Sequence, residues 1–127
     1  MGRVTEKIRL TNIFEPTKSV EIEALIDSGA TLVSVPLHVV KELNLRKLRE
    51  ATVRYADNRT AERAIYGVVT LEIQGRAGEF DVMAEPDGGR VLVGQIVLDQ
   101  LDLIIDPSAR KVLPNPRSPE MPMIDQF

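Results

Sequence analysis

The sequence predicts a small, mainly β domain with one or two short helices. In several segments apolar residues alternate with charged ones, a period of two that is typical of a strand with one buried face. Most other apolar runs are short and are bounded by Gly, Pro, Asp or Asn, which favour turns. The 127 residues are enough for one compact domain and hardly for two.

The first third of the chain is expected to hold two strands and a short helix. Val4 to Asn12 is the first predicted strand, and it ends at a turn-like segment, residues 14–18. The second runs from Val20 to Ile26, where every second residue is apolar and two of the others are glutamates. After an apolar stretch, Leu32 to Val35, Pro36 suits the first helical position, and apolar residues follow at spacings of three. We therefore expect an amphipathic helix from Pro36 to about Leu43.

A hairpin and a further pair of strands are predicted in the middle of the chain. Residues 51–56 and 60–66 flank the polar turn Asp57-Asn58-Arg59, and Asp and Asn tolerate left-handed backbone angles better than most residues. Residues 68–73 and 80–84 form the next expected pair, joined across Gly75 and Gly78. The middle of the chain is thus predicted to be sheet.

The last third is predicted to combine short strands, a helix and a proline-rich tail. Val91-Leu92-Val93 is a short apolar strand that stops at Gly94, and Ile96 to Leu101 suits a short helix. Residues 103–105 and 111–113 flank a turn at Asp106-Pro107-Ser108. Residues 114–127 contain four prolines, so we expect an extended or disordered tail there, following a domain formed by residues 1–113.

Composition and charge exclude several functional classes. A net charge of −3 and an isoelectric point near 5.2 argue against a nucleic-acid-binding protein with a broad basic face. No apolar run approaches the roughly 20 residues that span a bilayer. Charged residues interrupt the first ten positions, where a signal peptide would need an apolar stretch. We therefore expect a cytoplasmic protein without a membrane partner. Without cysteine and with His38 as the single histidine, the chain is expected to bind no metal or cofactor. Carboxylates and hydroxyls are the reactive groups that remain.

The segment that carries most information is Ala24-Leu25-Ile26-Asp27-Ser28-Gly29-Ala30-Thr31. An apolar strand leads into an ionisable Asp27 and a tight Ser-Gly turn, after which the chain becomes apolar again. An unpaired carboxylate is costly to bury near a core. Gly29 permits close backbone approach, and Ser28 places a hydroxyl beside the carboxylate. On its own, however, Asp-Ser-Gly is also a good turn sequence.

Two motifs resemble landmarks of the retropepsin-like aspartic proteases. Asp27-Ser28-Gly29-Ala30 resembles their Asp-Thr/Ser-Gly-Ala active-site loop, and Val91-Leu92-Val93-Gly94 with the following helix looks like their second landmark, an apolar segment and glycine that thread beside that loop. The order of the elements between the motifs also fits. The stretches 103–107 and 113–116 look like a prokaryotic branch of single-domain members. The resemblance spans roughly residues 20–112 and implies a closed β-barrel or sandwich that forms half of an aspartic protease.

The resemblance implies a homodimer with endopeptidase activity. Aspartic proteases use two carboxylates that share a proton around one water, because two like charges at close range cannot both ionise cheaply. This chain has one Asp-Ser-Gly, so the second carboxylate would be Asp27 of another copy, placed beside the first by a twofold axis. The expected catalytic residue is Asp27, the expected substrate is a peptide or protein, and the reaction needs no cofactor.

Further site residues follow from the same resemblance. Ser28 is similar to the hydroxyl residue that bonds across the dimer axis, and small Ala30 would lie beside the substrate backbone. The hairpin near Tyr55, Ala56, Asp57 and Asn58 would form the flap that closes over the peptide, and Val93, Gly94 and Gln95 would support the active-site loop. Viral members commonly have an acidic residue at the position of Thr31 and an arginine at that of Gln95, which form an ion pair. Here both are neutral, and we expect a hydrogen bond between them instead.

Two other interpretations remain open on the sequence alone. A dimeric, non-catalytic peptide-binding or dimerisation module of the same fold would use the same groove and symmetry. An unrelated small β domain would use Asp27-Ser28-Gly29 merely as a turn. The intact Asp-Ser-Gly favours the enzyme, because a carboxylate pair on a symmetry axis is costly unless it is used.

Overall fold

The computed structural model describes residues 3–126 of the chain. Its elements are, in order, β1 (Val4–Asn12), β2 (Ser19–Ile26), β3 (Val33–Pro36), α1 (Leu37–Glu42), β4 (Arg46–Arg54), β5 (Thr60–Ile73), β6 (Arg76–Glu85), β7 (Val91–Val93), α2 (Gln95–Gln100), β8 (Leu103–Asp106) and β9 (Lys111–Pro114). The predicted class, a mainly β protein with one or two short helices, is confirmed, and the described residues form two helices. Among the described residues, neither helix is long and apolar enough to cross a membrane.

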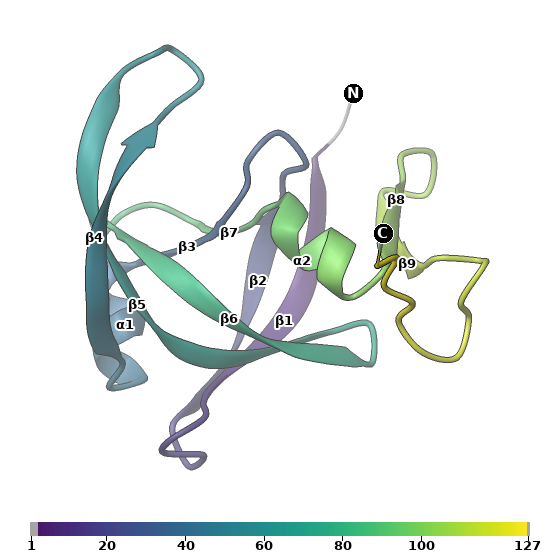
Figure 1. Ribbon diagram of the computed structural model, residues 1–127, viewed down its shortest axis with the longest axis horizontal. Helices are drawn as coiled ribbons and strands as arrows, with labels where there is room; N and C mark the ends of the chain where they lie inside the picture. The colour runs from purple at the N-terminus through teal and green to yellow at the C-terminus, as the bar shows by residue number, and fades with distance from the viewer. Residues whose placement is uncertain (1–2, 127) are drawn as a thin grey trace.

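Six of the strands close into a barrel. They follow the order β1-β2-β7-β3-β6-β5, and β5 pairs back onto β1, while β4 continues the sheet outward from β5 (Figure 1). The period-two pattern explains the closure, because one face of each strand is apolar and points inward. The core is formed by such residues, for example Ile8, Leu10, Ala24, Leu71 and Val93, all no more than 1% exposed.

Strand β5 is longer than the sequence suggested. Residues 60–66 and 68–73 were expected as separate strands, but they form one strand of 14 residues that carries an irregularity where it passes Gly67. Its second half pairs with β1 and β6, whereas Thr60 to Arg63 pair only with β4. The β4–β5 hairpin therefore projects from the barrel as a two-stranded arm, at the upper left of Figure 1.

The proline-rich tail is irregular but attached to the barrel. Pro114 still pairs with Leu103, at the end of the small β8–β9 sheet. Beyond it, buried Arg76 donates hydrogen bonds to the carbonyl oxygens of Leu101, Asp102 and Ser118, and the carboxylate of Asp102 accepts hydrogen bonds from Ser118, Asn115 and the backbone of Met123. Residues 115–126 have no helix or strand, and part of this segment is held by buried polar groups. The domain boundary after residue 113 remains a prediction.

Candidate active site

Strand β7 lies between the two strands that the Asp27 loop connects. It pairs in parallel with β2, with Ile26 opposite Val93, and antiparallel with β3, with Ser34 opposite Leu92. The loop from residue 27 to residue 32 therefore has to cross the end of β7. The backbone N–H of Asp27 donates a 2.9 Å hydrogen bond to the carbonyl oxygen of Val93, which fixes where the loop begins.

Gly94 makes that crossing possible. A Cβ atom at this position would lie 2.5 Å from the carbonyl oxygen of Leu32 and 2.5 Å from the carbonyl carbon of Thr31. No side chain fits there without moving the backbone. Just beyond it, the backbone N–H groups of Gln95 and Ile96 donate to the carbonyl oxygens of Ala30 and Thr31, at 2.8 and 3.0 Å. The start of α2 and the Asp27 loop are thus bound to each other through main-chain groups.

The carboxylate of Asp27 is partly held by its own turn. Its Oδ1 accepts a 2.9 Å hydrogen bond from the backbone N–H of Gly29, and the N–H of Ala30 donates to the Asp27 carbonyl oxygen at 3.1 Å. A Cβ on residue 29 would lie 3.2 Å from Oδ1, so a side chain there would press on the carboxylate. The turn that is also expected of an unrelated β domain is therefore present. Asp27 is half-buried, and no other hydrogen bond to its carboxylate is formed within residues 3–126.

A groove of about 530 Å³ separates this loop from the projecting hairpin. Asp27, Gly29, Ala30 and Thr31 line it from the loop side, and residues 51–56 line it from the hairpin side. In Figure 1 the two segments rise from the same end of the barrel, with the hairpin at the upper left and the loop near the centre. The arrangement can hold an extended chain between a carboxylate and an arm.

The structure brings together some of the expected site residues and leaves others outside the groove. Tyr55 and Ala56 line the groove, whereas Asp57 and Asn58 form the exposed tip of the hairpin, where Asn58 has a φ of 67°. Ser28 is exposed on the turn. Val93, Gly94 and Gln95 support the loop from behind without lining the groove.

The expected hydrogen bond between Thr31 and Gln95 is wrong. The side-chain Nε2 of Gln95 donates instead to Oδ1 of Asp99, one turn further along α2, at 2.8 Å. Within residues 3–126 no side-chain hydrogen bond joins Gln95 to Thr31. The physical reason is local: an i,i+4 partner on the same helix lies within easy reach of a glutamine side chain. The contact between the two segments is made by their backbones.

Several groove residues had not been singled out from the sequence. Ser34, Met83, Glu85 and Leu92 line the groove, and they come from three different strands of the barrel. Leu92 could have been found, because it alternates with the buried Val91 and Val93 and so points to the other face of β7. Glu85 carried no local signal, since it stands at the end of a strand before a proline and a loop.

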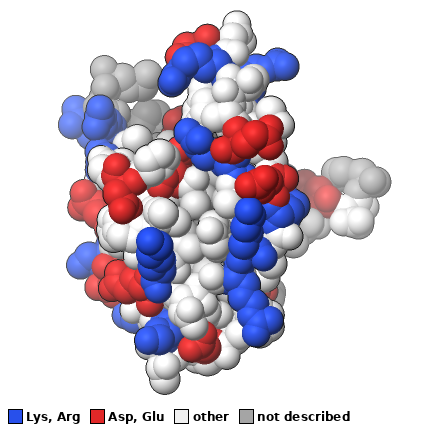
Figure 2. Space-filling model, turned by 90° about the vertical axis from the view of Figure 1, so that its left-hand side faces the viewer, with Lys and Arg blue, Asp and Glu red and all other residues white. Residues whose placement is uncertain are grey.

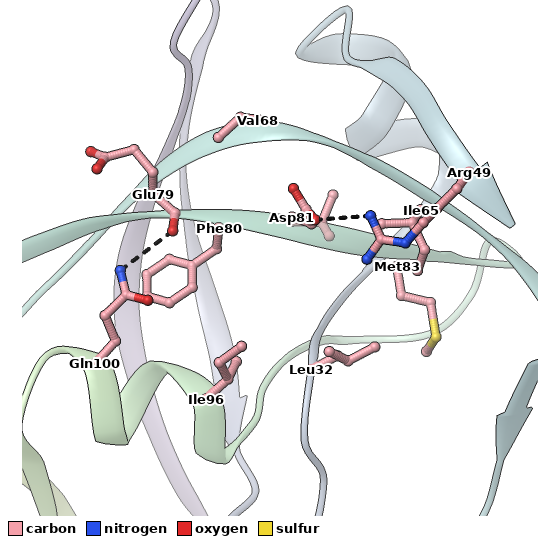
Figure 3. Close-up of a pocket in the computed structure, with 11 residues that line it drawn as sticks. Leu32, Arg49, Ile65, Val68, Glu79, Phe80, Asp81, Met83, Ile96 and Gln100 are labelled. Carbon is pink, nitrogen blue, oxygen red and sulfur yellow. Dashed lines mark hydrogen bonds and ion pairs between the residues drawn. The ribbon is translucent and has the colours of Figure 1, made fainter. Parts of the chain in front are cut away.

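A second, smaller hollow of about 260 Å³ lies beside the groove, between β6 and the start of α2 (Figure 3). Leu32 and Met83 line both hollows. Figure 3 shows Phe80 and Ile96 facing each other across it, with the Arg49–Asp81 ion pair at its rim. Asp27 does not line it.

Charged side chains of both signs are mixed on the face that carries the hairpin. Figure 2 shows Lys and Arg next to Asp and Glu on either side of an uncharged strip, and not one continuous basic surface. Two ion pairs involve strand β4: Lys47 pairs with Glu50 of the same strand, and Arg49 pairs with Asp81 of β6. This face therefore has no dominant sign of charge.

No protein-family model matches the chain, and no curated protein matches it at a significant level.

Proposed function

We propose that the chain is one subunit of a homodimeric, retropepsin-like aspartic endopeptidase, with Asp27 as its catalytic residue. The observation that carries the proposal is the position of Asp27: it stands on a Ser-Gly turn that crosses an inserted strand, and it faces a groove closed on the other side by a projecting hairpin. Buried Gly94, which admits no side chain, is the second landmark that the resemblance requires.

The proposed chemistry makes the dimer necessary. One chain supplies one carboxylate to the groove on the loop side, while activation of water between two carboxyl groups needs a second. Ser28, Gly29 and Thr31 are exposed around Asp27 in the single chain, so this end of the barrel is free to meet a second copy. An isologous contact across a twofold axis would bring the two Asp27 residues together.

The reaction would proceed without a covalent intermediate. The ionised carboxylate takes a proton from the bound water, whose oxygen forms a bond to the carbonyl carbon of the peptide, while the protonated carboxyl donates its proton to the carbonyl oxygen. The tetrahedral diol then breaks its C–N bond: the nitrogen takes a proton from one carboxyl group, and a hydroxyl of the diol returns one to the other. The products are a carboxylic acid and an amine, and the pair again holds one proton.

The groove suits an extended peptide segment. Residues 51–56 line the groove and belong to or adjoin β4, the last strand in the order of its sheet, and an edge strand is suited to pair with an extended substrate. Leu32, Met83 and Leu92 supply apolar wall, and Arg54 and Glu85 supply charge. Such a lining favours an unfolded or extended chain over a folded protein surface.

A proteolysis assay on an unfolded protein tests the proposal. Wild type is expected to cleave reduced, carboxymethylated casein, more readily at mildly acidic pH, and Asp27→Asn is expected to lose at least about a thousandfold in rate, since one member of the pair is removed from each subunit. Asp125→Asn, an exposed carboxylate of the tail, is the matched control and should keep full activity.

The other two interpretations give different results in the same assay. A non-catalytic binding module would hold casein peptides equally well in wild type and in Asp27→Asn, and neither would cleave them. An unrelated β domain would show neither cleavage nor binding in the groove. Cleavage that survives in Asp27→Asn at the wild-type rate would contradict the proposed role of this carboxylate.

A further inference from the structure

A polar cluster connects the hairpin arm to the wall of the barrel beside the groove. The hydroxyl of Tyr55 donates a 2.7 Å hydrogen bond to Oε2 of Glu85. The Nε–H of Arg63 donates to the hydroxyl of Tyr55 and to Oε1 of Glu85, each at 3.0 Å. Tyr55 follows β4, Arg63 belongs to β5 and Glu85 ends β6, so the cluster joins both strands of the arm to a third strand outside it.

The arm has no other side-chain hydrogen bond to the rest of the described chain. Residues 51–63 pair only with each other along β4 and β5, and their remaining side-chain hydrogen bonds, such as those from Thr52 to Glu62 and from Arg59 to Asp57, stay within the arm. A two-stranded hairpin alone is marginally stable in water. The hydrogen bonds to Glu85 are therefore expected to fix the position of the arm relative to the barrel.

The charges of the cluster are partly protected from solvent. The side chains of Arg63 and Glu85 are 27% and 23% exposed, less than in most ion pairs of this protein. Burial raises the pKa of the Tyr55 phenol, and the Glu85 carboxylate that accepts its hydrogen bond raises it further, so the phenol stays protonated and keeps donating at neutral pH. The guanidinium groups of Arg59 and Arg63 both lie within 6 Å of the centre of the Tyr55 ring, which adds a cation–π contribution.

We propose that Glu85 and Arg63 are positioning residues, which hold the Tyr55 side chain and through it keep the hairpin arm closed over the groove. Tyr55 and Glu85 line the same groove as Asp27, so the cluster spans it from the arm to the barrel wall. This inference rests on the proposed function only for the role of the closed arm, which is to hold a peptide substrate in the groove. The restraint on the arm follows from the hydrogen bonds themselves and can be measured without turnover.

Amide hydrogen exchange of residues 51–63 is the direct test, performed on the full chain. In Tyr55→Phe we expect exchange in this segment to accelerate about tenfold, the order of effect of a hydrogen bond to a charged group. Glu85→Ala should accelerate it more, because Arg63 also loses this acceptor. Glu85→Gln keeps one accepting oxygen and places an NH2 group where the other oxygen stood, so its exchange should lie between wild type and Glu85→Ala. The double variant Tyr55→Phe/Glu85→Ala should accelerate exchange by less than the product of the two single effects, because both changes remove the Tyr55–Glu85 hydrogen bond, although the double variant also loses the bond from Arg63 to Tyr55.

Tyr66→Phe is the matched control. Tyr66 lies on the same strand as Arg63 and is half-buried, but its hydroxyl makes no hydrogen bond within residues 3–126, so exchange in the arm should not change. If Glu85→Ala fails to fold, Tyr55→Phe still decides the matter, because it removes one oxygen atom and leaves the ring in place.

A kinetic measurement separates positioning from local stability. Peptide should leave a loosely closed groove faster, so Tyr55→Phe should raise KM for a casein peptide about tenfold with a smaller change in kcat. Unchanged exchange in Tyr55→Phe, or faster exchange with unchanged KM, would overturn the proposal. If wild type cleaves no casein but Tyr55→Phe still exchanges faster than wild type, the restraint on the arm is supported and the proposed function is rejected.

Discussion

Gly94 lies against the backbone of Thr31 so closely that a Cβ atom added to it would be 2.5 Å from the carbonyl carbon of Thr31. The contact occurs where the Asp27 loop crosses the end of β7, and two main-chain hydrogen bonds on its far side keep the segments together. Because the clashing atoms are backbone atoms, rotation of a side chain cannot relieve the clash.

Gly94→Ala should therefore destabilise the fold and displace the Asp27 loop. We expect the free energy of unfolding to fall by about 1–3 kcal/mol, the usual cost of overpacking a tight site. Urea denaturation of Gly94→Ala measures this, with Gly89→Ala as the control, since the nearest atom to a Cβ at residue 89 is 3.8 Å away. If the two variants had the same free energy of unfolding, the Asp27 loop would be shown to move away from the added Cβ atom without loss of stability.

The proposed dimer predicts how active and inactive subunits combine. If Asp27 residues from two chains form one site, equal mixing of wild type with Asp27→Asn, after free exchange of subunits, leaves about one quarter of the dimers with both carboxylates. The mixture should then have about a quarter of the activity of the same total amount of wild type. About half would remain if each chain acted alone, so casein cleavage by the mixture distinguishes the two cases. Asp125→Asn, mixed in the same way, should leave activity unchanged.

Local patterns were enough to predict most strands and the position of the Asp27 turn. Alternation identified β2, and Asp57-Asn58 identified the tip of the hairpin, because both signals are contained in a few consecutive residues. Gly67 was taken as the end of a strand, yet β5 continues through it, since pairing with neighbours on both sides outweighs the low strand preference of one glycine.

Interactions between distant residues could not be predicted in this way. Tyr55 and Glu85 are 30 residues apart, and no local sequence pattern at either position indicates a contact with the other. No prediction was made for Arg76, which is 6% exposed and donates hydrogen bonds to carbonyl oxygens as far along the chain as Ser118. The place of β7 between β2 and β3 was suggested only by resemblance, because no sequence period encodes the order of strands.

Asp102 predicts a loss of stability in acid. Hydrogen bonds from the side chains of Ser118 and then Asn115 lower the pKa of its carboxyl group below the ordinary value near 3.8. A carboxyl whose pKa is lowered in the folded state stabilises that state fully above the unfolded pKa, and this contribution is lost as the pH falls through the folded value. The urea midpoint of wild type should therefore drop more steeply below about pH 4 than that of Asp102→Asn.

The same experiment has a control and a contrary result. Asp125→Asn changes an exposed carboxylate of the tail that lies 4.0 Å from Arg117 and accepts no hydrogen bond within residues 3–126, so the acid profile of this variant should follow wild type. Parallel profiles for wild type and Asp102→Asn over the acid range would mean that the Asp102 hydrogen bonds do not favour the ionised form.

Arg76 predicts that the tail contributes to the stability of the barrel. Its guanidinium donates to three carbonyl oxygens, those of Leu101 and Asp102 after α2 and that of Ser118 in the tail. Arg76→Met keeps much of the apolar stem but leaves these buried acceptors without a donor, so we expect a loss of about 1–3 kcal/mol in the free energy of unfolding. Cleavage of the tail by trypsin at Arg117 should become faster, because the Ser118 carbonyl is released from the barrel. Arg90→Met, which changes an exposed arginine near Glu23, should alter neither quantity. If Arg76→Met leaves both stability and tail cleavage at their wild-type values, the tail does not depend on this arginine. The predicted domain boundary after residue 113 would then also separate the stable domain from a segment that this arginine does not stabilise.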